Sequence, residues 1–165
     1  MQRMDPKALD LRPFDVLDTR WALLVAGRQR PNPMTVSWGG MGTVWNLPVA
    51  TAFVRPSRFT FELIEKDRCF TLNVLPEEYR DALRLCGAKS GRDIDKWKET
   101  GLAHEPSVEV PVPRVVQAEL VLECRVAAFT DIRPEGFLTD EPTAFYSSGD
   151  YHRVYFGEVL AAWRA

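Results

Sequence analysis

The sequence predicts a mainly β fold, a small antiparallel barrel with short helical insertions. Several short apolar or alternating runs are typical of strands, and turn residues separate them. Only two stretches favour helix, so helices do not alternate regularly with strands and a parallel sheet is disfavoured. A barrel is the economical arrangement of such strands, because closure removes exposed sheet edges.

Three strands are expected in the first third of the chain. Residues 21–26 form a short apolar run before a turn, which indicates a strand. One long strand is expected over residues 31–45, with Pro33 near its start, where proline is tolerated. Small and β-branched residues predict a third strand over residues 47–54.

The two helices flank a further strand. Residues 56–67 are expected to form a helix capped by Ser57. Residues 68–76 alternate, which predicts a strand with one buried face. Residues 77–88 predict a second helix, with an acidic start and Gly87 at its stop.

The last part of the chain repeats the strand pattern. Residues 115–132 are long enough for one extended strand. A turn at residues 148–150 then leads into a final strand over residues 152–162. No internal repeat or low-complexity linker interrupts the chain.

Length and composition exclude several classes of protein. The 165 residues carry a net charge of −2 with 45% hydrophobic residues, which suits one domain over residues 1–165. The sequence shows no basic face of the kind expected of a nucleic-acid-binding protein. No run of roughly 18 apolar residues suggests a membrane span, and the amino terminus lacks a signal-peptide core. We therefore expect a cytoplasmic protein without nucleic-acid or membrane partners.

Cysteine and histidine positions predict neither a metal site nor a catalytic side chain. Cys69, Cys86 and Cys124 have no disulfide or metal-ligand spacing, and we interpret them as structural thiols. Cys86 precedes a glycine at a predicted helix end, where a thiol can be exposed. Of the two histidines, His104 lies in a polar loop, whereas His152 opens a strand beside an acidic residue. No nucleophile with a base and an orienting acid can be placed.

Two basic, hydroxyl-bearing turns are suited to an anion. The turn VRPSRFT, residues 54–60, lies at a helix mouth, where free N–H donors favour phosphate. The turn KSGRDIDKW, residues 89–97, surrounds a glycine, and Asp93 is expected to cap the helix that carries Lys96. Each turn taken alone is equally compatible with a solvated surface.

The combination of motifs resembles a known family. The stretches NPMTVSWGG, VRPSRFTFELI, FTLNVLP, CGAKSGRDIDKW and GDYHRVYFGEV occur in the order found in the flavin reductase-like, FMN-binding split-barrel family, and most closely its flavoredoxin branch. SGRDIDK is the most specific of these motifs. The resemblance runs from about residue 18 to about residue 160.

The resemblance implies a six-stranded antiparallel Greek-key barrel that works as a homodimer, with non-covalent FMN near the subunit interface. It places the flavin ring along the strand that carries Asn32, Thr35 and Trp38, with the Thr35 hydroxyl near ring atom N5. Ser37 shares the face of Thr35 by the two-residue period of a strand, whereas Trp38 points the other way. The remaining positions implied for the cofactor are Thr60 and Lys96 at the phosphate end and His152 in the last strand. To these the anion argument adds Arg55, Ser57 and Ser90.

The function implied is transfer of electrons from NAD(P)H through FMN to flavin or another acceptor. Flavin carries the redox chemistry, so no side chain need act as acid or base. Two alternatives stay open: a flavoredoxin-type electron carrier for a redox partner protein, without significant NAD(P)H oxidation, and a cofactor-free barrel that binds a ligand or serves as a scaffold. Family members often carry a tail that packs near the flavin. Here only residues 160–165 follow Val159, so we expect a more open ring.

Overall fold

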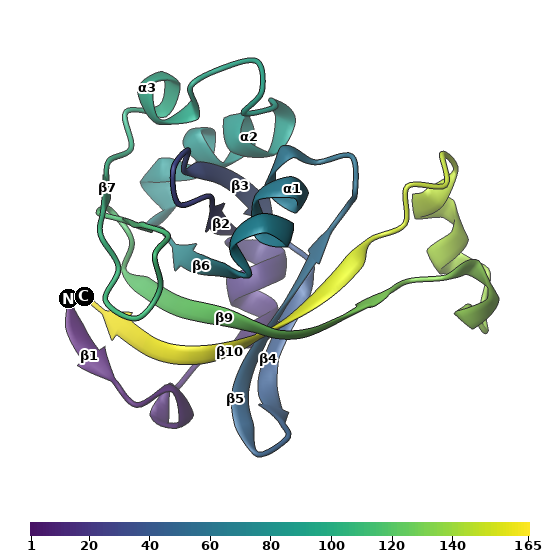
Figure 1. Cartoon of the computed structure of the whole chain (residues 1–165), viewed down its shortest axis with the longest axis horizontal. Helices are drawn as coiled ribbons and strands as arrows, with labels where there is room; N and C mark the ends of the chain where they lie inside the picture. The colour runs from purple at the N-terminus through teal and green to yellow at the C-terminus, as the bar shows by residue number, and fades with distance from the viewer.

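One antiparallel sheet dominates the structure, a computed structural model that describes residues 1–165 (Figure 1). The sheet has eight strands. In spatial order they are β3 (Asn32–Val36), β2 (Ala22–Ala26), β6 (Cys69–Val74), β9 (Leu120–Asp131), β10 (Arg153–Arg164), β5 (Leu47–Val54) and β4 (Gly39–Val44), with β1 (Gln2–Met4) paired to the end of β10. The predicted mainly β, antiparallel split barrel is confirmed, although with eight strands rather than six.

A break in the barrel, here called the seam, separates β3 from β4. These strands lie at the two ends of the pairing order, yet only Ser37 and Trp38 join them in the chain. The prediction of one strand over residues 31–45 is therefore wrong. β3 pairs with β2, whereas β4 pairs with β5, so the chain leaves one hairpin and enters another at this point. Gly39 permits the change, because a Cβ there would lie 2.5 Å from the Thr51 carbonyl oxygen.

The other predicted strands have the expected places with some corrected ends. Residues 47–54 are confirmed as β5, and the strands predicted at residues 21–26 and 152–162 are β2 and β10 with shifted ends. The single strand predicted over residues 115–132 is wrong. Its first residues belong to β8 (Arg114–Val115), which pairs with β7 (His104–Glu105) in a separate small sheet, and β9 begins at Leu120.

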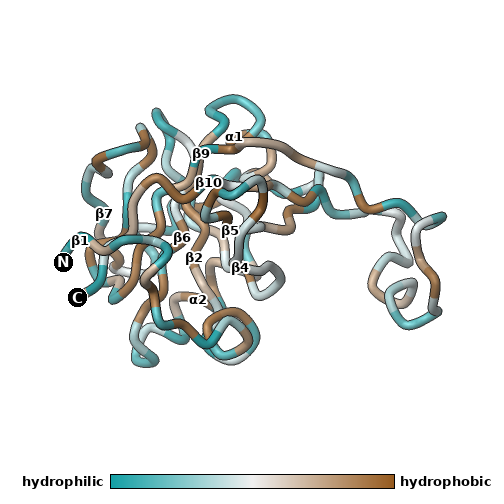
Figure 2. Tube along the Cα trace, turned by 90° about the horizontal axis from the view of Figure 1, so that it is seen from below, coloured by the Kyte–Doolittle hydropathy of each residue, from teal (hydrophilic) through white to brown (hydrophobic).

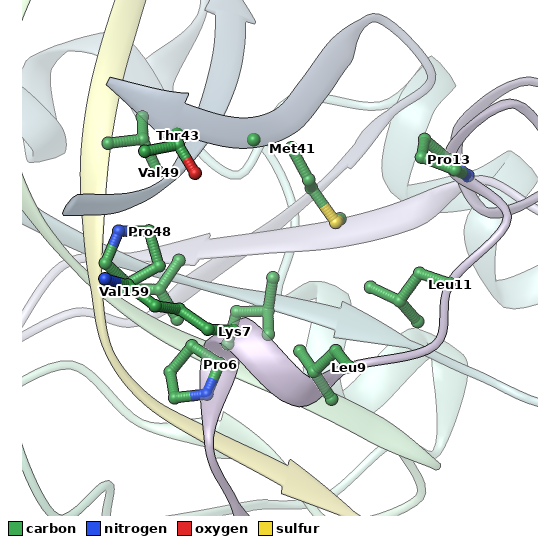
Figure 3. A pocket seen from close by; sticks show the side chains of 12 residues that line it. Pro6, Lys7, Leu9, Leu11, Pro13, Met41, Thr43, Pro48, Val49 and Val159 are labelled. Atoms are coloured by element: carbon green, nitrogen blue, oxygen red, sulfur yellow. The ribbon is translucent and has the colours of Figure 1, made fainter. Parts of the chain in front are cut away.

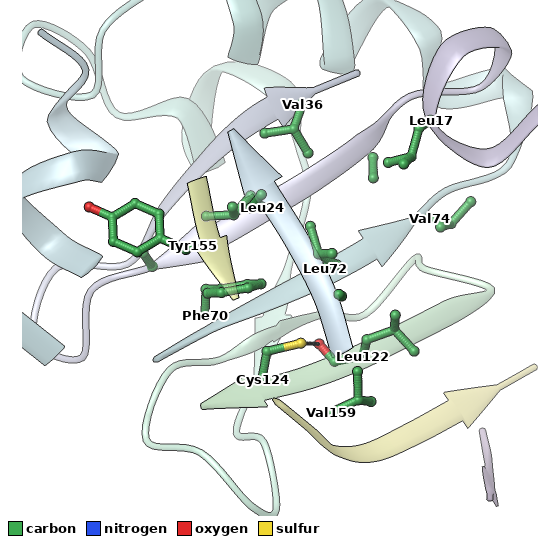
Figure 4. Packing of buried hydrophobic residues seen from close by; sticks show 14 of the residues in the cluster. Leu17, Leu24, Val36, Phe70, Leu72, Val74, Leu122, Cys124, Tyr155 and Val159 are labelled. Carbon is green, nitrogen blue, oxygen red and sulfur yellow. Dashed lines mark hydrogen bonds between the residues drawn. The ribbon is translucent and has the colours of Figure 1, made fainter. Parts of the chain in front are cut away.

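The main hydrophobic core fills the inside of the barrel. Phe70 and Leu72 of β6 and Leu122 of the adjacent β9 lie side by side on one face of the sheet in Figure 4, and all three are buried. All six residues of β6 are buried, so the prediction of one buried face is wrong. Its second face is covered by the segment before β8, because Cys69 packs with Val110 and Val112 and the Thr71 hydroxyl donates to the Pro113 carbonyl at 2.9 Å. A separate cluster joins Leu83 of helix α2 (Arg80–Ala88) to Leu23 and Val25 of β2. The polar Asn73 on β6 is compatible with this burial because its amide donates to the Leu23 carbonyl at 3.1 Å.

The predicted helices exist, but their ends differ from expectation. Helix α1 spans Phe59–Asp67 and has no side-chain cap, because the Ser57 hydroxyl donates to Asp150 instead. Helix α2 follows the short 3₁₀ turn η3 (Glu77–Tyr79) and runs through Gly87, so this glycine is not its stop. Helix α3 (Lys96–Thr100) is capped by Asp95 rather than Asp93.

All three cysteines are free and buried, which confirms the structural interpretation. Exposure of Cys86 at a helix end is not observed, because α2 continues to Ala88 and packs that thiol inward. His104 is exposed, as its polar loop predicts, and its ring lies 4.7 Å from that of Trp97.

An arm, residues 127–152, extends away from the barrel where β9 and β10 continue past it (Figures 1 and 2). It carries the turns η4 (Pro134–Gly136) and η5 (Glu141–Tyr146). Several of its apolar side chains are exposed, and Leu138 is 96% exposed. The remaining short turns are η1 (Pro6–Ala8) and η2 (Asp15–Thr19) near the amino terminus. No helix is long and apolar enough to span a bilayer.

Candidate functional site

Two adjoining pockets beside the seam contain all ten residues that sequence reasoning assigned to a cofactor. The aromatic pocket, of about 280 Å³, is lined by Met34, Thr35, Val36, Ser37, Trp38, Phe53, Arg55, Arg58, Gly87, Phe145 and His152. The basic pocket, of about 120 Å³, is lined by Asn32, Met34, Ser57, Arg58, Phe59, Thr60, Cys86, Lys89, Ser90, Gly91, Arg92 and Lys96. The pockets share Met34 and Arg58, and together they are called the cleft below.

The basic pocket brings the two predicted anion-binding turns together. The Arg92 guanidinium donates to the Ser57 carbonyl oxygen at 3.1 Å, so the turns at residues 54–60 and 89–97 are in contact. Four cationic side chains line this pocket, namely Arg58, Lys89, Arg92 and Lys96. Sequence reasoning placed Arg58 and Arg92 in the turns without assigning them to the cofactor, and it missed Lys89. The position of Lys89 beside Ser90 in the KSGR turn was the available signal.

Asn32 fixes the floor of the basic pocket. Its amide donates to the Thr60 hydroxyl at 2.9 Å, which ties β3 to the first turn of α1. Gly91 lies directly against this amide, because a Cβ at that position would be 1.8 Å from the Asn32 Oδ1 atom. Only a glycine lets the 89–97 turn approach β3 this closely.

Lys96 lies in the wall of the basic pocket and is only 4% exposed. Its ammonium group donates to the Pro33 carbonyl at 2.9 Å and to the Cys86 carbonyl at 2.8 Å. The Cys86 carbonyl belongs to the last turn of α2, where carbonyls lack helical partners. Burial lowers the pKa of Lys96 to about 8. An ammonium has three donors, so one remains for an anion in the pocket.

The aromatic pocket is built around His152 and Trp38. The Trp38 ring centroid lies 4.9 Å from His152 and 5.3 Å from Phe145. Burial, assisted by the charge of Arg55, lowers the pKa of His152 to about 4, so the imidazole is neutral near pH 7. Its Nδ1 lies 2.8 Å from the Tyr146 hydroxyl, which fixes the ring orientation.

The two hydroxyls of β3 and its following residue differ in availability. The Thr35 hydroxyl donates to the Leu83 carbonyl oxygen at 2.5 Å, so its proton is already used and only an acceptor lone pair remains. Ser37 makes no side-chain hydrogen bond within the chain and lines the aromatic pocket. In this arrangement Ser37, rather than Thr35, holds the free donor.

Arg55 and Ser57 fasten the arm to the rim of the cleft. The Arg55 guanidinium donates to the Asp150 carbonyl at 2.7 Å and to the Phe145 carbonyl at 2.8 Å. The Ser57 hydroxyl donates to the Asp150 carboxylate at 2.5 Å. Both side chains were assigned to an anion, but the Ser57 hydroxyl proton and two of the five Arg55 N–H donors are engaged with the arm here.

A separate cavity of about 330 Å³ lies between the amino-terminal segment and the β4–β5 hairpin (Figure 3). Met41 and Leu9 point into it from opposite sides, and Lys7 is its one titratable side chain. None of the predicted site residues lines it. No group of three or more His, Cys, Asp or Glu side chains is placed to hold a metal ion.

Comparison with known proteins agrees with the resemblance stated above. An uncharacterized protein of Archaeoglobus fulgidus is 29% identical over 141 residues, which cover 86% of this chain and 70% of that protein. Flavoredoxin of Desulfovibrio vulgaris (Miyazaki F) aligns with a TM-score of 0.69 and 20% identity, over 88% of this chain and 69% of its own. An FMN-binding protein from Thermus thermophilus aligns with a TM-score of 0.70 and 22% identity, over 99% of this chain and 78% of its own. These two structures support the fold.

Comparison of the sequence with family models shows the family to which this chain belongs. A model described as "Flavin reductase like domain" matches residues 18–165. The match begins before β2, ends after β10 and includes every residue that lines the cleft. This chain therefore belongs to the flavin reductase like domain family.

Proposed function

We propose that this protein is an FMN-binding oxidoreductase that passes electrons from NAD(P)H through FMN to flavin or another acceptor. The observation that carries the proposal is the chemistry of the cleft, which is cationic and hydroxyl-lined at one end and aromatic at the other. FMN has the matching asymmetry of a phosphate and a flat, hydrogen-bonding ring. The family match and the FMN-binding protein of similar fold support this choice of cofactor.

The basic pocket is the proposed phosphate end. Arg58, Lys89 and Arg92 supply charge, while Thr60 and Ser90 supply hydroxyl donors. The first turn of α1 adds backbone N–H groups that have no helical partner. Charge-assisted hydrogen bonds to phosphate are stronger than neutral ones, so these groups fit the group they are proposed to hold.

The aromatic pocket is the proposed ring end. Trp38 and Phe53 form apolar walls, the free Ser37 hydroxyl offers a donor, and neutral His152 adds a polar edge without a charge. When bound, FMN supplies the hydride and electron chemistry. The chain's own residues would position the ring, exclude water and adjust its potential by hydrogen bonds, with no side chain required as acid or base.

The alternative is a flavoredoxin-type electron carrier without significant NAD(P)H oxidation. The similarity of fold to a flavoredoxin favours it, and the cleft chemistry is the same in both cases. The two functions differ only in whether NAD(P)H itself reduces the bound cofactor.

The visible spectrum tests the proposal. We expect purified protein to be yellow, or to become yellow after incubation with FMN, and heat-released pigment to run as FMN. Anaerobic NADH or NADPH should then bleach the flavin band within seconds. Recovery of FAD as the main pigment, or no binding of FMN, would contradict the cofactor. Bleaching by dithionite but not by either nicotinamide would favour the carrier.

We also propose that the protein is a homodimer. The arm exposes Phe129, Leu138 and Phe145, and exposed apolar side chains on an arm that projects from a small barrel are suited to contact with a second subunit. Light scattering should give about twice the mass of the chain, with or without FMN. A monomer that binds FMN tightly would contradict this assembly.

A further inference from the structure

A second apolar groove adjoins the cleft on the other side of Trp38. It has a volume of about 590 Å³ and is here called the outer groove. Its lining comprises Pro13, Phe14, Leu17, Asp18, Ser37, Trp38, Gly39, Gly40, Met41 and Phe53. Ser37, Trp38 and Phe53 also line the aromatic pocket, so these residues form a wall common to both spaces.

The walls of the outer groove suit a flat apolar ligand. Phe14 is 89% exposed and Trp38 is 38% exposed, so two large aromatic surfaces face solvent at one place. Grouped apolar exposure of this kind is uncommon outside binding sites. The volume is within the range of small-molecule sites, about 300–1,000 Å³.

The charge of the outer groove selects among possible ligands. Asp18 is its only charged lining residue, and no lysine or arginine lines it. An anion placed there would meet a carboxylate and no cation. The phosphates of a nicotinamide nucleotide therefore have no partner in the groove, in contrast to the cationic side chains of the cleft.

We propose that the outer groove binds a small uncharged aromatic electron acceptor of the quinone class. Reduction of the quinone rests on the proposed function, because the electrons come from NAD(P)H through the cofactor. NAD(P)H gives up a hydride, which is two electrons and one proton, and solvent supplies a second proton. The quinone gains two electrons and two protons, its two carbonyl oxygens become hydroxyls, and the products are hydroquinone and NAD(P)⁺.

Binding of redox-inert probes tests the groove independently of turnover. Calorimetric titration of the full-length protein, with and without FMN, should show that neutral 2-naphthol binds and naphthalene-2-sulfonate binds far more weakly. Phe14→Ala removes one aromatic wall and should weaken 2-naphthol binding by roughly 3- to 10-fold. Trp45→Ala removes an exposed ring at the far end of the β4–β5 hairpin and should leave binding unchanged. Because Phe14 is almost fully exposed, folding should tolerate its loss.

A charge reversal makes the test sharper. Asp18→Lys should improve naphthalene-2-sulfonate binding by roughly 3- to 10-fold and leave 2-naphthol unchanged, because only the charge preference is altered. With FMN and NADPH, Phe14→Ala should lower kcat/KM for 1,4-naphthoquinone by the same factor as it weakens 2-naphthol, with FMN content unchanged.

Two binding results would overturn the proposal: equal binding of the two probes by the unaltered protein, or no effect of Phe14→Ala on 2-naphthol binding. A third would be conversion of the dimer to a monomer by Phe14→Ala, because a second copy of the chain would then cover the groove. Failure of the proposed function is distinguishable, since protein that does not bind FMN would still bind 2-naphthol in a Phe14-dependent way.

Discussion

Replacing Lys96 by methionine is expected to lower the free energy of unfolding by about 2–5 kcal/mol. The buried ammonium satisfies the carbonyls of Pro33 and Cys86, and each buried carbonyl left without a donor costs about 1–3 kcal/mol. Methionine keeps the apolar stem and relieves the burial of the amine, which offsets part of this loss. Equilibrium unfolding in urea measures the difference.

The matched control is Lys98→Met on the same short helix. Lys98 is exposed and its side chain makes no hydrogen bond, so the change should stay within about 0.5 kcal/mol. Equal losses in the two variants would show that the contacts of Lys96 with β3 and α2 do not stabilise the fold.

The same residue should make FMN affinity depend on pH. Bound phosphate favours the ammonium form, and the pKa of Lys96 in the free protein is lowered to about 8. Affinity should thus be constant between about pH 7, where the FMN phosphate is already a dianion, and pH 8, and fall above pH 8 by at most about tenfold per pH unit. Riboflavin, which has no phosphate, should show no such fall. Cys86 stays a neutral thiol in this range, because burial raises its pKa to about 11.

The stability contributed by Lys96 should change with pH in the opposite direction. An unfolded chain retains the proton up to a pKa of about 10.5, whereas the folded chain releases it near 8. Between these values the unfolded state binds more protons, so this group stabilises the fold increasingly as pH rises. Urea unfolding at pH 8 and pH 10, compared with Lys96→Met at both, isolates the effect.

Gly91→Ala should weaken FMN binding by about tenfold or more. The new methyl group would fall on the Asn32 amide, which already holds Thr60, so the 89–97 turn must move away from β3. Overpacking of this kind costs typically about 1–3 kcal/mol, and about 1.4 kcal/mol corresponds to a tenfold loss of affinity. Fluorescence titration with FMN, at a temperature where the variant remains folded, measures the effect.

Gly136→Ala is the control for this change. Gly136 lies on the arm, where an added methyl group would meet no heavy atom within 4 Å, and its φ is not positive, so alanine should be tolerated. If Gly91→Ala bound FMN as well as Gly136→Ala, the basic pocket would not be the phosphate end of the site.

Local patterns were sufficient for much of the fold. The apolar run of β2 and the small, β-branched residues of β5 specify strands wherever their partners lie. The seam could not be predicted in this way, because residues 31–45 change pairing partner at Trp38 and nothing local identifies the partners. Likewise, the second buried face of β6 depends on residues 110–115, which pack over Cys69, Thr71 and Asn73 from outside the sheet.

The candidate site was also predictable only in part. The residue types and the family motifs were enough to assign ten positions, and the structure places all ten around one cleft. The hydrogen-bond partners were not predictable. Ser57 reaches Asp150 on the arm and Thr35 reaches Leu83 on α2, contacts between segments far apart in the sequence. Such contacts decide which donors remain free for a ligand. The sequence therefore predicted which residues lie around the cleft, but the roles of Thr35, Arg55 and Ser57 stayed open.

The seam between β3 and β4 also constrains the order in which the protein can fold. The hairpins β2–β3 and β4–β5 can each form from neighbouring residues. Joining them into a barrel requires β6 to pair with β9 and β5 with β10, as in the pairing of Val54 with Arg153. Such long-range pairings are the slow steps of folding, because the entropy cost of closing a large loop must be met before stabilising contacts form. The aromatic pocket takes Phe53 from β5 and Phe145 and His152 from the arm as well as residues of β3, so a newly made chain completes this end of its cleft only when these distant segments have come together.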